Sequence, residues 1–493
     1  MTNDQNRARL HLSKSLFIRG LQCHKSLYLD RYQRELKDEV SEEKQALFDS
    51  GTEVGILARD LFPGGVEVPY EGLSRQEQLD MTASEIQKGT ENIYEAAFSY
   101  NNVFMKADIL HKGRRGWALY EVKQSTGVKD VHVNDVALQC YVVKGSNLPV
   151  SGAFLVYINN QYVRHGEIEV EKLFAIEDLT DRVKEKQEFV AEEIDKMRAM
   201  LTGTVPAIDI GAWCDNPYEC DFKGHCWQHM PEDSVFTLKR KGANQFDLYR
   251  QGIIRLEQIP LHVLSDAQRM QVEFFLEKKE SVNREAVQEF LDSLWYPLYF
   301  LDFETFMSAV PPFDGTRPYQ QIPYQYSMHV LEREGAELRH HEFLAEPNVD
   351  PREELAERLV TLIPDDACVV AYNSSFEANR LRELAEWLPQ HGDRIERIVS
   401  NMRDLMAPFR RRDVYHWQMK GSHSQKAVLP ALVPDMSYEG MEVADGGMAM
   451  EAYFAMCAAK DPSEVGRIRT SLLEYCKLDT LGMVRILEKL KSL

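Results

Sequence analysis

The chain has 493 residues, of which 44% are hydrophobic and 28% are charged, a balance typical of globular proteins. This length exceeds what one hydrophobic core usually supports, so we expect two or three domains. The net charge of −20, from 58 basic and 78 acidic residues, argues against indiscriminate, charge-driven coating of nucleic acid. This net charge still allows local basic patches beside acidic sites to contact nucleic acid.

No apolar run approaches the length that crosses a membrane, and the opening segment MTNDQNRARLHLSK lacks the apolar core of a signal peptide. We therefore expect a cytoplasmic protein with no membrane partner. In that reducing compartment the eight cysteines should not form a disulfide framework. Four of them lie in apolar or mixed segments and are expected to be small buried side chains: Cys140, Cys368, Cys457 and Cys476.

The other four cysteines are placed differently. Cys23 lies in a helical pattern that begins after Ser13. Three more follow much later in WCDNPYECDFKGHCW, with five residues between neighbours: Cys214, Cys220 and Cys226. Such spacing favours a metal site, and zinc is one candidate, with His225 or His229 replacing one thiolate.

The segment Lys106–Lys123 is expected to belong to two strands, Val103–Leu110 and Trp117–Val122, joined by a turn in HKGRRG. Side chains two apart on a strand share a face, so Glu121 and Lys123 point the same way, and Asp108 reaches them if the strands pair. Such charges are costly in a core. They suit a divalent cation beside an ammonium group that meets a water or phosphate oxygen. The alternative is an exposed hairpin with ordinary surface charges.

The D…ExK spacing resembles the signature of restriction-endonuclease-like nucleases, and DVALQCY at residues 135–141 resembles the helix that follows it in the RecB branch. With one early and three late cysteines, the segment is similar to iron–sulfur RecB-like nucleases, including the CRISPR-adaptation exonucleases. This resemblance implies a restriction-endonuclease-like α/β/α domain with Mg²⁺ or Mn²⁺ on Asp108 and Glu121. It also implies a [4Fe–4S] cluster on Cys23, Cys214, Cys220 and Cys226. The catalytic residues that it implies are Asp108, Glu121, Lys123 and Gln139.

One position departs from that family. Many members carry a histidine where this chain has Gly55, which leaves the third metal ligand open. Glu53 and Glu95 are candidates, although each is expected first to be an ordinary surface or structural carboxylate.

A helix over Asp181–Leu201 is expected to pack on this domain and return the chain to the cysteines, so that residues 1–235 form one domain. Residues 236–294 are expected to form a helical connector. Within it, LYRQGIIRLEQIP is faintly similar to a hairpin of two short helices. A linker that sets the spacing of the domains is favoured over a dedicated DNA-binding hairpin.

Residues 295–493 are expected to form another domain. The strand YPLYFLDFETF places Asp302 and Glu304 on one side. A strand, a turn and a helix follow in ACVVAYNSSFEANRLREL, and the helix SLLEYCKLDTLGMVRILEKL places Tyr475 and Asp479 on one face.

The order DxE, YNxxFE, YxxxD resembles the DEDDy subgroup of DnaQ-like 3′–5′ exonucleases, above all the proofreading domains of B-family polymerases. It implies a ribonuclease-H-like fold in which Tyr475 orients the attacking water. The residues that would hold two Mg²⁺ or Mn²⁺ ions are Asp302, Glu304, Glu377 and Asp479.

Position 377 is glutamate where those exonucleases have aspartate, so the metal preference is altered or the site is weakened. Asp404 is a spare acid that could compensate, although a loop or capping role is the first expectation. Four cations are expected to contact nucleic acid, because Tyr415 and Trp417 nearby offer stacking surfaces: Arg410, Arg411, Arg412 and Lys426. Solvated loop charge is the alternative.

Together with GSHSQK and MSYEGMEVADGG, these features make nearly the whole chain resemble an uncharacterised bacterial family of two-domain proteins. We expect a metal-dependent nuclease with two active sites that acts on DNA in repair, recombination or defence. One alternative is a module that binds nucleic-acid ends or assists assembly, with one degenerate site. Another is an RNA exonuclease, since carboxylate-bound metals meet phosphates rather than 2′-hydroxyls.

Overall fold

The structure is a computed structural model that describes residues 9–493, and it is a mixed α/β protein with more than one sheet. The chain divides into two compact units. The first contains Met1–His229 and Ser308–Tyr319, and the second contains Met230–Met307 and Gln320–Leu493. This differs from the predicted domains, because the connector belongs to the second unit and Ser308–Tyr319 belongs to the first.

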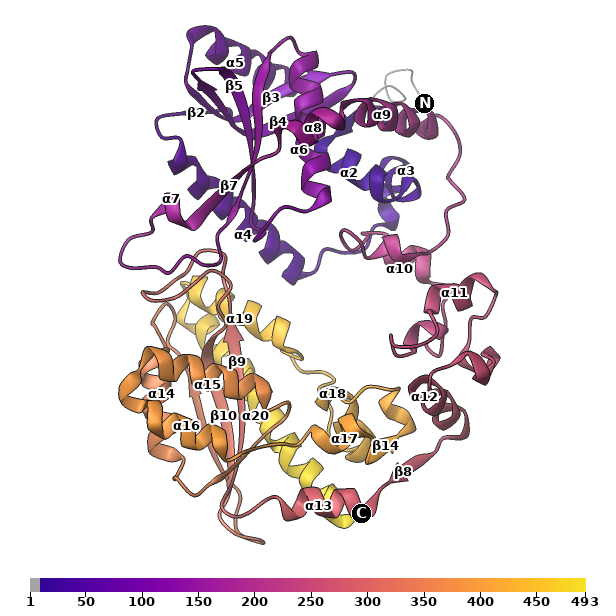
Figure 1. Ribbon diagram of the computed structural model, residues 1–493, viewed down its shortest axis with the longest axis vertical. Coiled ribbons are helices and arrows are strands. Elements are labelled where there is room, and N and C mark those ends of the chain that lie inside the picture. Colours follow the sequence, from indigo (N-terminus) through magenta and orange to yellow (C-terminus); the bar gives the residue numbers. More distant parts are fainter. Residues whose placement is uncertain (1–8) are drawn as a thin grey trace. The chain divides into compact units, whose positions relative to one another are not determined.

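The first unit is built on a seven-stranded mixed sheet of order β2-β3-β4-β5-β6-β7, with β1 paired to β4 (Figure 1). The strands are β1 (Leu12–Ser13), β2 (Val66–Glu67), β3 (Asn92–Tyr100), β4 (Val103–Gly113), β5 (Gly116–Lys123), β6 (Val150–Ile158) and β7 (Phe174–Asp178). The helices are α2 (Lys14–Gln22), α3 (His24–Tyr32), α4 (Glu42–Ala58), α5 (Arg75–Lys88), α6 (Asp130–Gly145), α7 (Val170–Leu173), α8 (Thr180–Glu185), α9 (Gln187–Leu201) and α10 (Lys223–Trp227).

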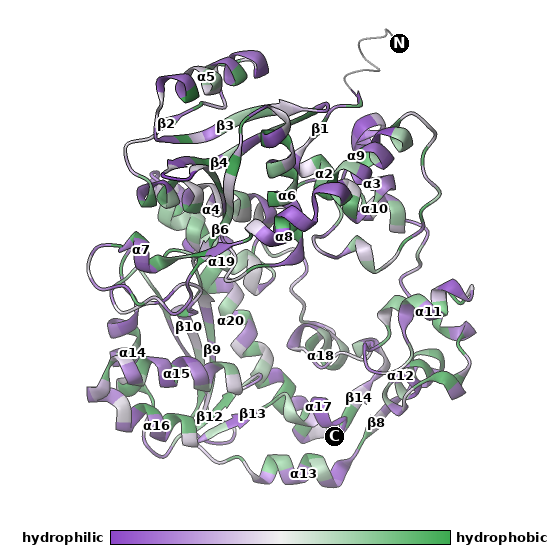
Figure 2. Cartoon of the chain, turned by 45° about the horizontal axis from the view of Figure 1, so that its top comes forward, coloured by the Kyte–Doolittle hydropathy of each residue, from purple (hydrophilic) through white to green (hydrophobic). Residues whose placement is uncertain are grey.

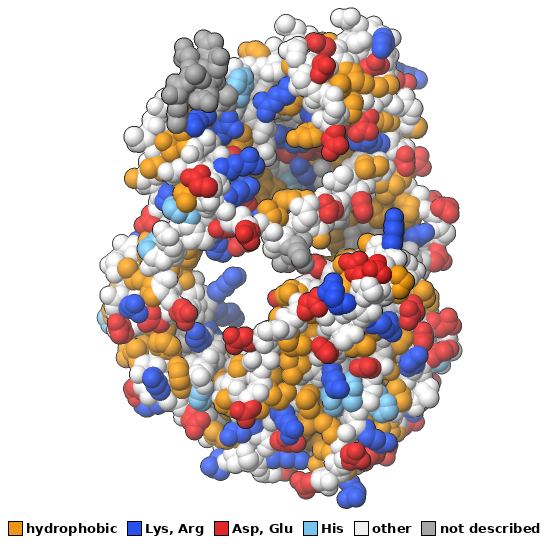
Figure 3. Space-filling view, turned by 180° about the vertical axis from the view of Figure 1, so that it is seen from behind, with side chains coloured by type: hydrophobic (Ala, Val, Ile, Leu, Met, Phe, Trp, Pro, Cys, Tyr) orange, Lys and Arg blue, Asp and Glu red, His pale blue; other side chains and the backbone are white. Residues whose placement is uncertain are grey.

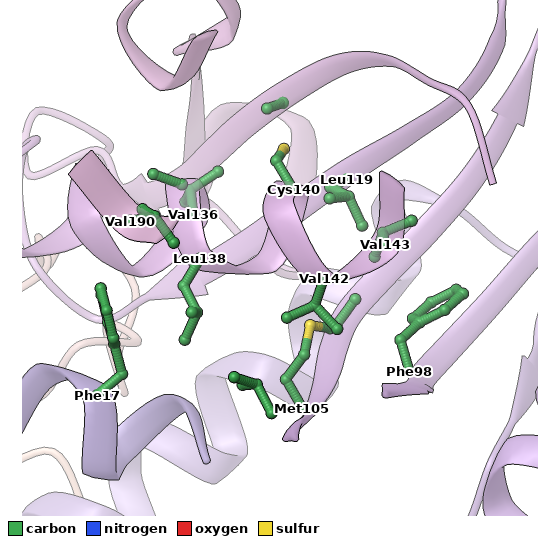
Figure 4. Close-up of a cluster of buried hydrophobic side chains, with 14 of the residues drawn as sticks. Phe17, Phe98, Met105, Leu119, Val136, Leu138, Cys140, Val142, Val143 and Val190 are labelled. Atoms are coloured by element: carbon green, nitrogen blue, oxygen red, sulfur yellow. The ribbon is translucent and has the colours of Figure 1, made fainter. Parts of the chain in front are cut away.

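Hydrophobic side chains cover both faces of this sheet. On one face, α2 and α6 pack against β3–β5 and α9 packs on these two helices, so that Phe17, Leu138 and Val190 meet in that layer (Figure 4). On the other face, Val54 and Ala58 of α4 pack against Tyr94 and Val122. A sheet covered by helices on both faces is an α/β/α arrangement of layers. This order of layers is the one expected for this part of the chain.

The predicted hairpin is confirmed. The strands β4 and β5 pair antiparallel from Gly113–Gly116 to Ile109–Tyr120, with only Arg114 and Arg115 between them. The predicted helix over Asp181–Leu201 is also present, but it is divided at Lys186 into α8 and α9.

The second unit contains a five-stranded sheet of order β11-β10-β9-β12-β13. Its strands are β9 (Leu298–Phe306), β10 (Ile322–Leu331), β11 (Arg339–Leu344), β12 (Cys368–Ala371) and β13 (Met402–Asp404). The strand β10 is antiparallel to both of its neighbours, whereas β9, β12 and β13 are parallel. Helices cover both faces, with α14–α16 on one side of β9 and β10 and α20 on the other (Figure 2). These helices are α14 (Arg352–Leu362), α15 (Ser375–Trp387), α16 (Gly392–Ser400), α17 (Ala407–Arg411), α18 (Gln425–Leu432), α19 (Gly446–Ala458) and α20 (Pro462–Ser492).

The connector is a folded part of the second unit rather than a bare linker. It contains α11 (Gln245–Arg250), α12 (Asp266–Glu277), β8 (Glu280–Val282) and α13 (Arg284–Asp292), and β8 pairs with β14 (Val414–His416). Val235, Leu248 and Val272 share a buried cluster, and the buried Gln271 amide donates to Thr237 O and Lys420 O. The helical connector expected for residues 236–294 therefore has a small core of its own, which its amphipathic pattern serves.

Among the described residues, no helix combines the length and the apolar character that crossing a membrane requires. Acidic and basic side chains are interspersed on the face drawn in Figure 3.

Phe17→Ala tests the core of the first unit. Phe17 is fully buried, so we expect the free energy of unfolding of this unit to fall by about 3–5 kcal/mol. The urea dependence of hydrogen–deuterium exchange in peptides from β3 and β4 measures it. The control is Phe48→Ala on α4, where the side chain is 52% exposed and the change should stay below about 0.5 kcal/mol. Equal effects of the two substitutions would contradict the assignment of this core.

Candidate functional sites

The acids of the first unit meet where the β4–β5 ladder ends. Pairing stops at Ile109–Tyr120, and the Asp108 carboxylate accepts the next free N–H, that of Val122, at 2.7 Å. Glu121 points from β5 toward α6, where the Gln139 amide donates to its Oε2 at 2.6 Å. The sequence-predicted residues Asp108, Glu121, Lys123 and Gln139 therefore lie together.

Two ammonium groups share one oxygen of this cluster. Lys123 Nζ lies 2.6 Å and Lys14 Nζ 2.8 Å from Glu121 Oε1. Lys123 also donates to Asp135 at 2.9 Å, and Lys14 lies 3.6 Å from Asp108. Glu121 is 1% exposed, so these contacts compensate a fully buried charge.

The two carboxylates are in different protonation regimes. Burial and then the Glu121 charge raise the pKa of Asp108 to about 7. Burial also acts to raise the pKa of Glu121, but the charges of Lys123 and Lys14 outweigh it and hold the pKa below its usual value. One acid of the pair is therefore firmly ionised, while the other titrates near neutrality.

The candidates for a third ligand are placed differently. Glu53 lies on the exposed surface of α4, and Gly55 has no neighbouring heavy atom within 4 Å of an added Cβ. Glu95 forms ion pairs with Arg59 at 3.8 Å and Lys106 at 3.7 Å, and its charge contributes to the raised pKa of Asp108. Glu95 is thus near the cluster but already paired with two cations.

Cys23, Cys214, Cys220 and Cys226 line one small cavity, together with Phe222 and other side chains. All are free thiols, and Cys220 Sγ lies 3.4 Å from the hydroxyl of Ser26. Burial raises the pKa values of Cys23 and Cys226.

Asp221 fixes the cysteine loop to the N-terminal helices. Its carboxylate pairs with Arg19, Lys44 and Lys37, the last at 3.1 Å, and its backbone carbonyl accepts from Asp38 N. The late cysteines are therefore positioned beside Cys23 by ion pairs that do not involve sulfur.

In the second unit, Asp302 and Glu304 face α20 from β9. The neighbouring β10 residues on that face bind the helix: Gln325 donates to Leu472 O at 2.8 Å, and the hydroxyls of Ser327 and Thr480 lie 2.7 Å apart. These bonds fix the position of α20 along the sheet, so that Tyr475 and Asp479 lie beside Asp302 and Glu304.

Glu377 enters the cluster from the first turn of α15. The preceding Asn373 has a φ of 71°, and its backbone N–H donates to Asp404 at 3.0 Å, which turns the chain from β12 into the helix. Glu377 is 2% exposed, and its charge contributes to the raised pKa values of Asp302 and Glu304. Its Oε2 has no hydrogen-bond partner among the described residues.

Mutual repulsion and burial dominate this cluster. Burial, followed by the charges of Asp479 and Glu304, raises the pKa of Asp302 well above its usual value. Burial raises the pKa of Asp479 to about 6 and that of Glu377 to about 8. Four buried acids that resist ionisation together are a set of oxygen donors that a divalent cation could stabilise.

Three neighbours of these acids were not predicted from the sequence. The Tyr438 hydroxyl donates to Asp479 at 2.5 Å, and Gln425 donates to Asp479 O at 2.7 Å. Cys476 Sγ lies 3.6 Å from Asp302, and one ligand atom from each of Asp302, Glu304 and Cys476 lies within 4.8 Å of the others. Cys476 was expected to be only a buried apolar side chain, so that interpretation was incomplete.

The predicted nucleic-acid contacts divide into two groups. Lys426 Nζ lies 5.8 Å from the ring centroids of both Tyr438 and Tyr475. Its positive charge partly offsets the rise in the pKa values of Glu304 and Asp479 that burial causes. The arginines lie on or beside α17, where Arg410 pairs with Asp404 at 3.1 Å and Arg411 with Asp413 at 2.7 Å. Asp404 also accepts from Met406 N, so it has the loop-capping role that was first expected.

Glu377→Gln tests the buried acid cluster. The native pKa of about 8 exceeds the ordinary value of 4.5, so the native state holds the extra proton and this group's contribution to stability is lost as pH rises from 4.5 to 8. With divalent cations chelated, the variant should match wild type at pH 5. At pH 8 its Tm should be higher by at least roughly 3 °C, which corresponds to at least about 1 kcal/mol for a unit of this size. The exposed Glu386→Gln is the control, and a variant no more stable than wild type at pH 8 would refute the raised pKa.

Comparison with known proteins finds a family model that matches part of the second unit. A family model called domain of unknown function (DUF2779) matches residues 299–424, which include Asp302, Glu304 and Glu377. The chain is similar to the uncharacterized protein MG366 homolog of Mycoplasma pneumoniae, with 28% identity over 239 residues, or 44% of this chain and 36% of the relative. It is also similar to the uncharacterized protein MG366 of Mycoplasma genitalium, with 25% identity over 290 residues, or 52% of this chain and 43% of the relative. The chain thus spans less than half the length of these relatives.

Proposed function

We propose that the protein is a metal-dependent nuclease that hydrolyses phosphodiester bonds of DNA, with a 3′–5′ exonuclease site in the second unit. One observation carries this proposal: Asp302, Glu304, Glu377 and Asp479 come from three elements to one buried cluster in which burial and mutual repulsion raise the pKa values of the acids. Carboxylate oxygens are hard ligands, and the orphaned Glu377 Oε2 fits a site built for a divalent ion. A bound Mg²⁺ or Mn²⁺ pair would polarise the phosphate and activate water.

The remaining residues of this site have roles that follow from their contacts. Burial and the neighbouring acids raise the pKa of Tyr475, so its hydroxyl stays protonated and can position a water. Lys426 supplies a positive charge beside the acids, where a phosphate would enter. Tyr438 and Gln425 hold Asp479 in place.

The fold of the second unit supports this proposal. Three antiparallel strands, β11, β10 and β9, are extended by the parallel strands β12 and β13, and the acids lie on β9, the first of these strands in the chain, and on flanking helices. This is the arrangement expected of the ribonuclease-H-like fold of DnaQ-like exonucleases.

In the first unit, we propose a second nuclease site of the RecB-like kind. Asp108 and Glu121 would hold a divalent ion, Lys123 would meet the attacking water or a phosphate oxygen, and Gln139 orients Glu121. Tyr141 of the same helix lies elsewhere, because its hydroxyl accepts from Asn101.

The four cysteines around one cavity fit a [4Fe–4S] cluster, which we propose is structural. They also fit a zinc site in donor type, but only Asp302, Glu304 and Cys476 form a compact group of ligand atoms among the described residues. Tetrahedral zinc would bring thiolates to about 3.8 Å from one another, so the wider spacing favours the cluster. The eight free thiols support a cytoplasmic location.

One observation favours a second candidate, a module that binds nucleic-acid ends. Glu121 already accepts from Lys14, Lys123 and Gln139, so the charge of this carboxylate is compensated without a metal. In that case the first unit would bind DNA and only the second would cut it.

A degradation assay with 5′-labelled DNA and RNA of one sequence, with Mg²⁺ or Mn²⁺, tests the nuclease proposal. We expect DNA to be shortened from its 3′ end and this activity to fall at least about 100-fold in Asp302→Asn and about 10-fold in Tyr475→Phe. Lys123→Ala should remove whatever cleavage survives in Asp302→Asn.

The matched controls are Asp247→Asn and Lys196→Ala, whose side chains are 58% and 56% exposed and should leave both activities unchanged. A 3′-terminal phosphorothioate should stop shortening from that end. Intact DNA under all conditions would reject the nuclease, and preferential loss of RNA would identify an RNA exonuclease instead.

Absorbance and metal analysis of anaerobically purified protein test the cluster. We expect a broad band near 400 nm, typical of Cys-ligated [4Fe–4S] centres, and about four iron atoms per chain. Cys220→Ser should abolish both, whereas Cys457→Ser, outside the cavity, should leave them intact. Stoichiometric zinc without iron would replace the cluster with a zinc site.

A further inference from the structure

Lys14 is held over the acids of the first unit by local structure. Leu12 and Ser13 form β1, which runs parallel to β4 opposite Val103 and Phe104. The Ser13 side chain then caps α2 by accepting from Leu16 N, so Lys14 is the first residue of that helix. A strand and a cap therefore fix the Lys14 backbone beside the ends of β4 and β5.

The Lys14 ammonium lies between the two carboxylates. Its Nζ is 2.8 Å from Glu121 Oε1 and 3.6 Å from Asp108 Oδ1. A divalent ion bound by the same oxygens would lie about 2.0–2.6 Å from them. The ammonium and the ion would then be close neighbours with like charge, at a site where such repulsion is poorly screened.

A second cation is needed here because the carboxylates around Lys14 are buried. Lys123 is shared between Glu121 and Asp135, so it does not compensate all three carboxylates of the cluster. Without a metal, Lys14 supplies a second positive charge, and the formal charges of the three carboxylates and two ammonium groups then sum to −1. With one divalent ion in its place, the formal charges of Asp108, Glu121, Asp135, Lys123 and the ion sum to zero.

We propose that Lys14 is a built-in counter-cation that occupies the metal position of the first unit's site, and that a divalent ion binds only as this ammonium leaves. The proposal rests on the metal site proposed above for Asp108 and Glu121. The Lys14 side chain is 27% exposed, and its long flexible stem allows the ammonium to move into solvent. Lys14 therefore sets the divalent concentration at which this site fills.

Manganese binding followed by electron paramagnetic resonance of free Mn²⁺ tests this, in the full chain at pH 8. Asp302→Asn and Asp479→Asn are present throughout to remove binding at the second site. Lys14→Gln should lower the Mn²⁺ dissociation constant at least about ten-fold, because the competing charge is gone. Lys88→Gln is the control, since Lys88 is 64% exposed and pairs with Glu85 far from the acids in sequence.

Unchanged or weaker Mn²⁺ binding in folded Lys14→Gln would overturn the proposal. Glu121→Gln separates this failure from that of the metal site: if Glu121→Gln binds Mn²⁺ as well as its parent, the site itself is absent and both proposals fall. If Glu121→Gln loses binding and Lys14→Gln changes nothing, only the role of Lys14 falls.

A second measurement avoids substitution of Lys14. Mass spectrometry reports how fast an amine-specific reagent modifies Lys14 in the otherwise intact chain. We expect the rate to rise at least about ten-fold when Mn²⁺ is added and not to rise in Glu121→Gln. A rate that Mn²⁺ leaves unchanged would show that the ammonium does not move, and would overturn the proposal even if Lys14→Gln failed to fold.

Discussion

The negative charges of carboxylates that are buried beside one another must be offset by positive charges or by protons. Both units contain such carboxylates. Each acid loses its hydration on burial, and each additional acid raises the cost of ionising the next. The backbone elements around the acids are held by unrelated bonds: a sheet ladder and a helix cap in the first unit, and the Gln325 and Ser327 contacts with α20 in the second. The charges are therefore gathered by the fold and not by attraction among themselves.

The two units meet this requirement in different ways. In the first, Lys14 and Lys123 surround Glu121, so the site is close to neutral and one acid remains firmly ionised. In the second, protons do most of the compensation, because burial raises the pKa values of Asp302, Glu304 and Glu377 more than the positive charges of Lys426 and Arg380 lower them. A divalent ion would have to displace an amine in the first case and protons in the second.

The cluster proposed for the cysteine cavity would add a constraint of covalent strength to the first unit. A cluster that joins Cys23 to the loop of Cys214, Cys220 and Cys226 would close about 190 residues of chain, and the entropy lost by the unfolded state grows slowly with that length. The Asp221 ion pairs already bring the loop to the N-terminal helices. The loop is thus preorganised, which suits a structural role for the metal centre.

The sequence by itself determined what depends on neighbours in the chain. Turn residues identified the β4–β5 hairpin, the period of two placed Asp302 with Glu304, and helical spacing placed Tyr475 with Asp479. Only the tertiary structure decided which distant residues complete the sites. Lys14 meets Glu121 across 107 positions, and Cys476 meets Asp302 across 174, through packing that no local pattern records. The packing of the connector was left open for the same reason: an amphipathic helix has one pattern whether its apolar face meets a neighbouring domain or a core of its own.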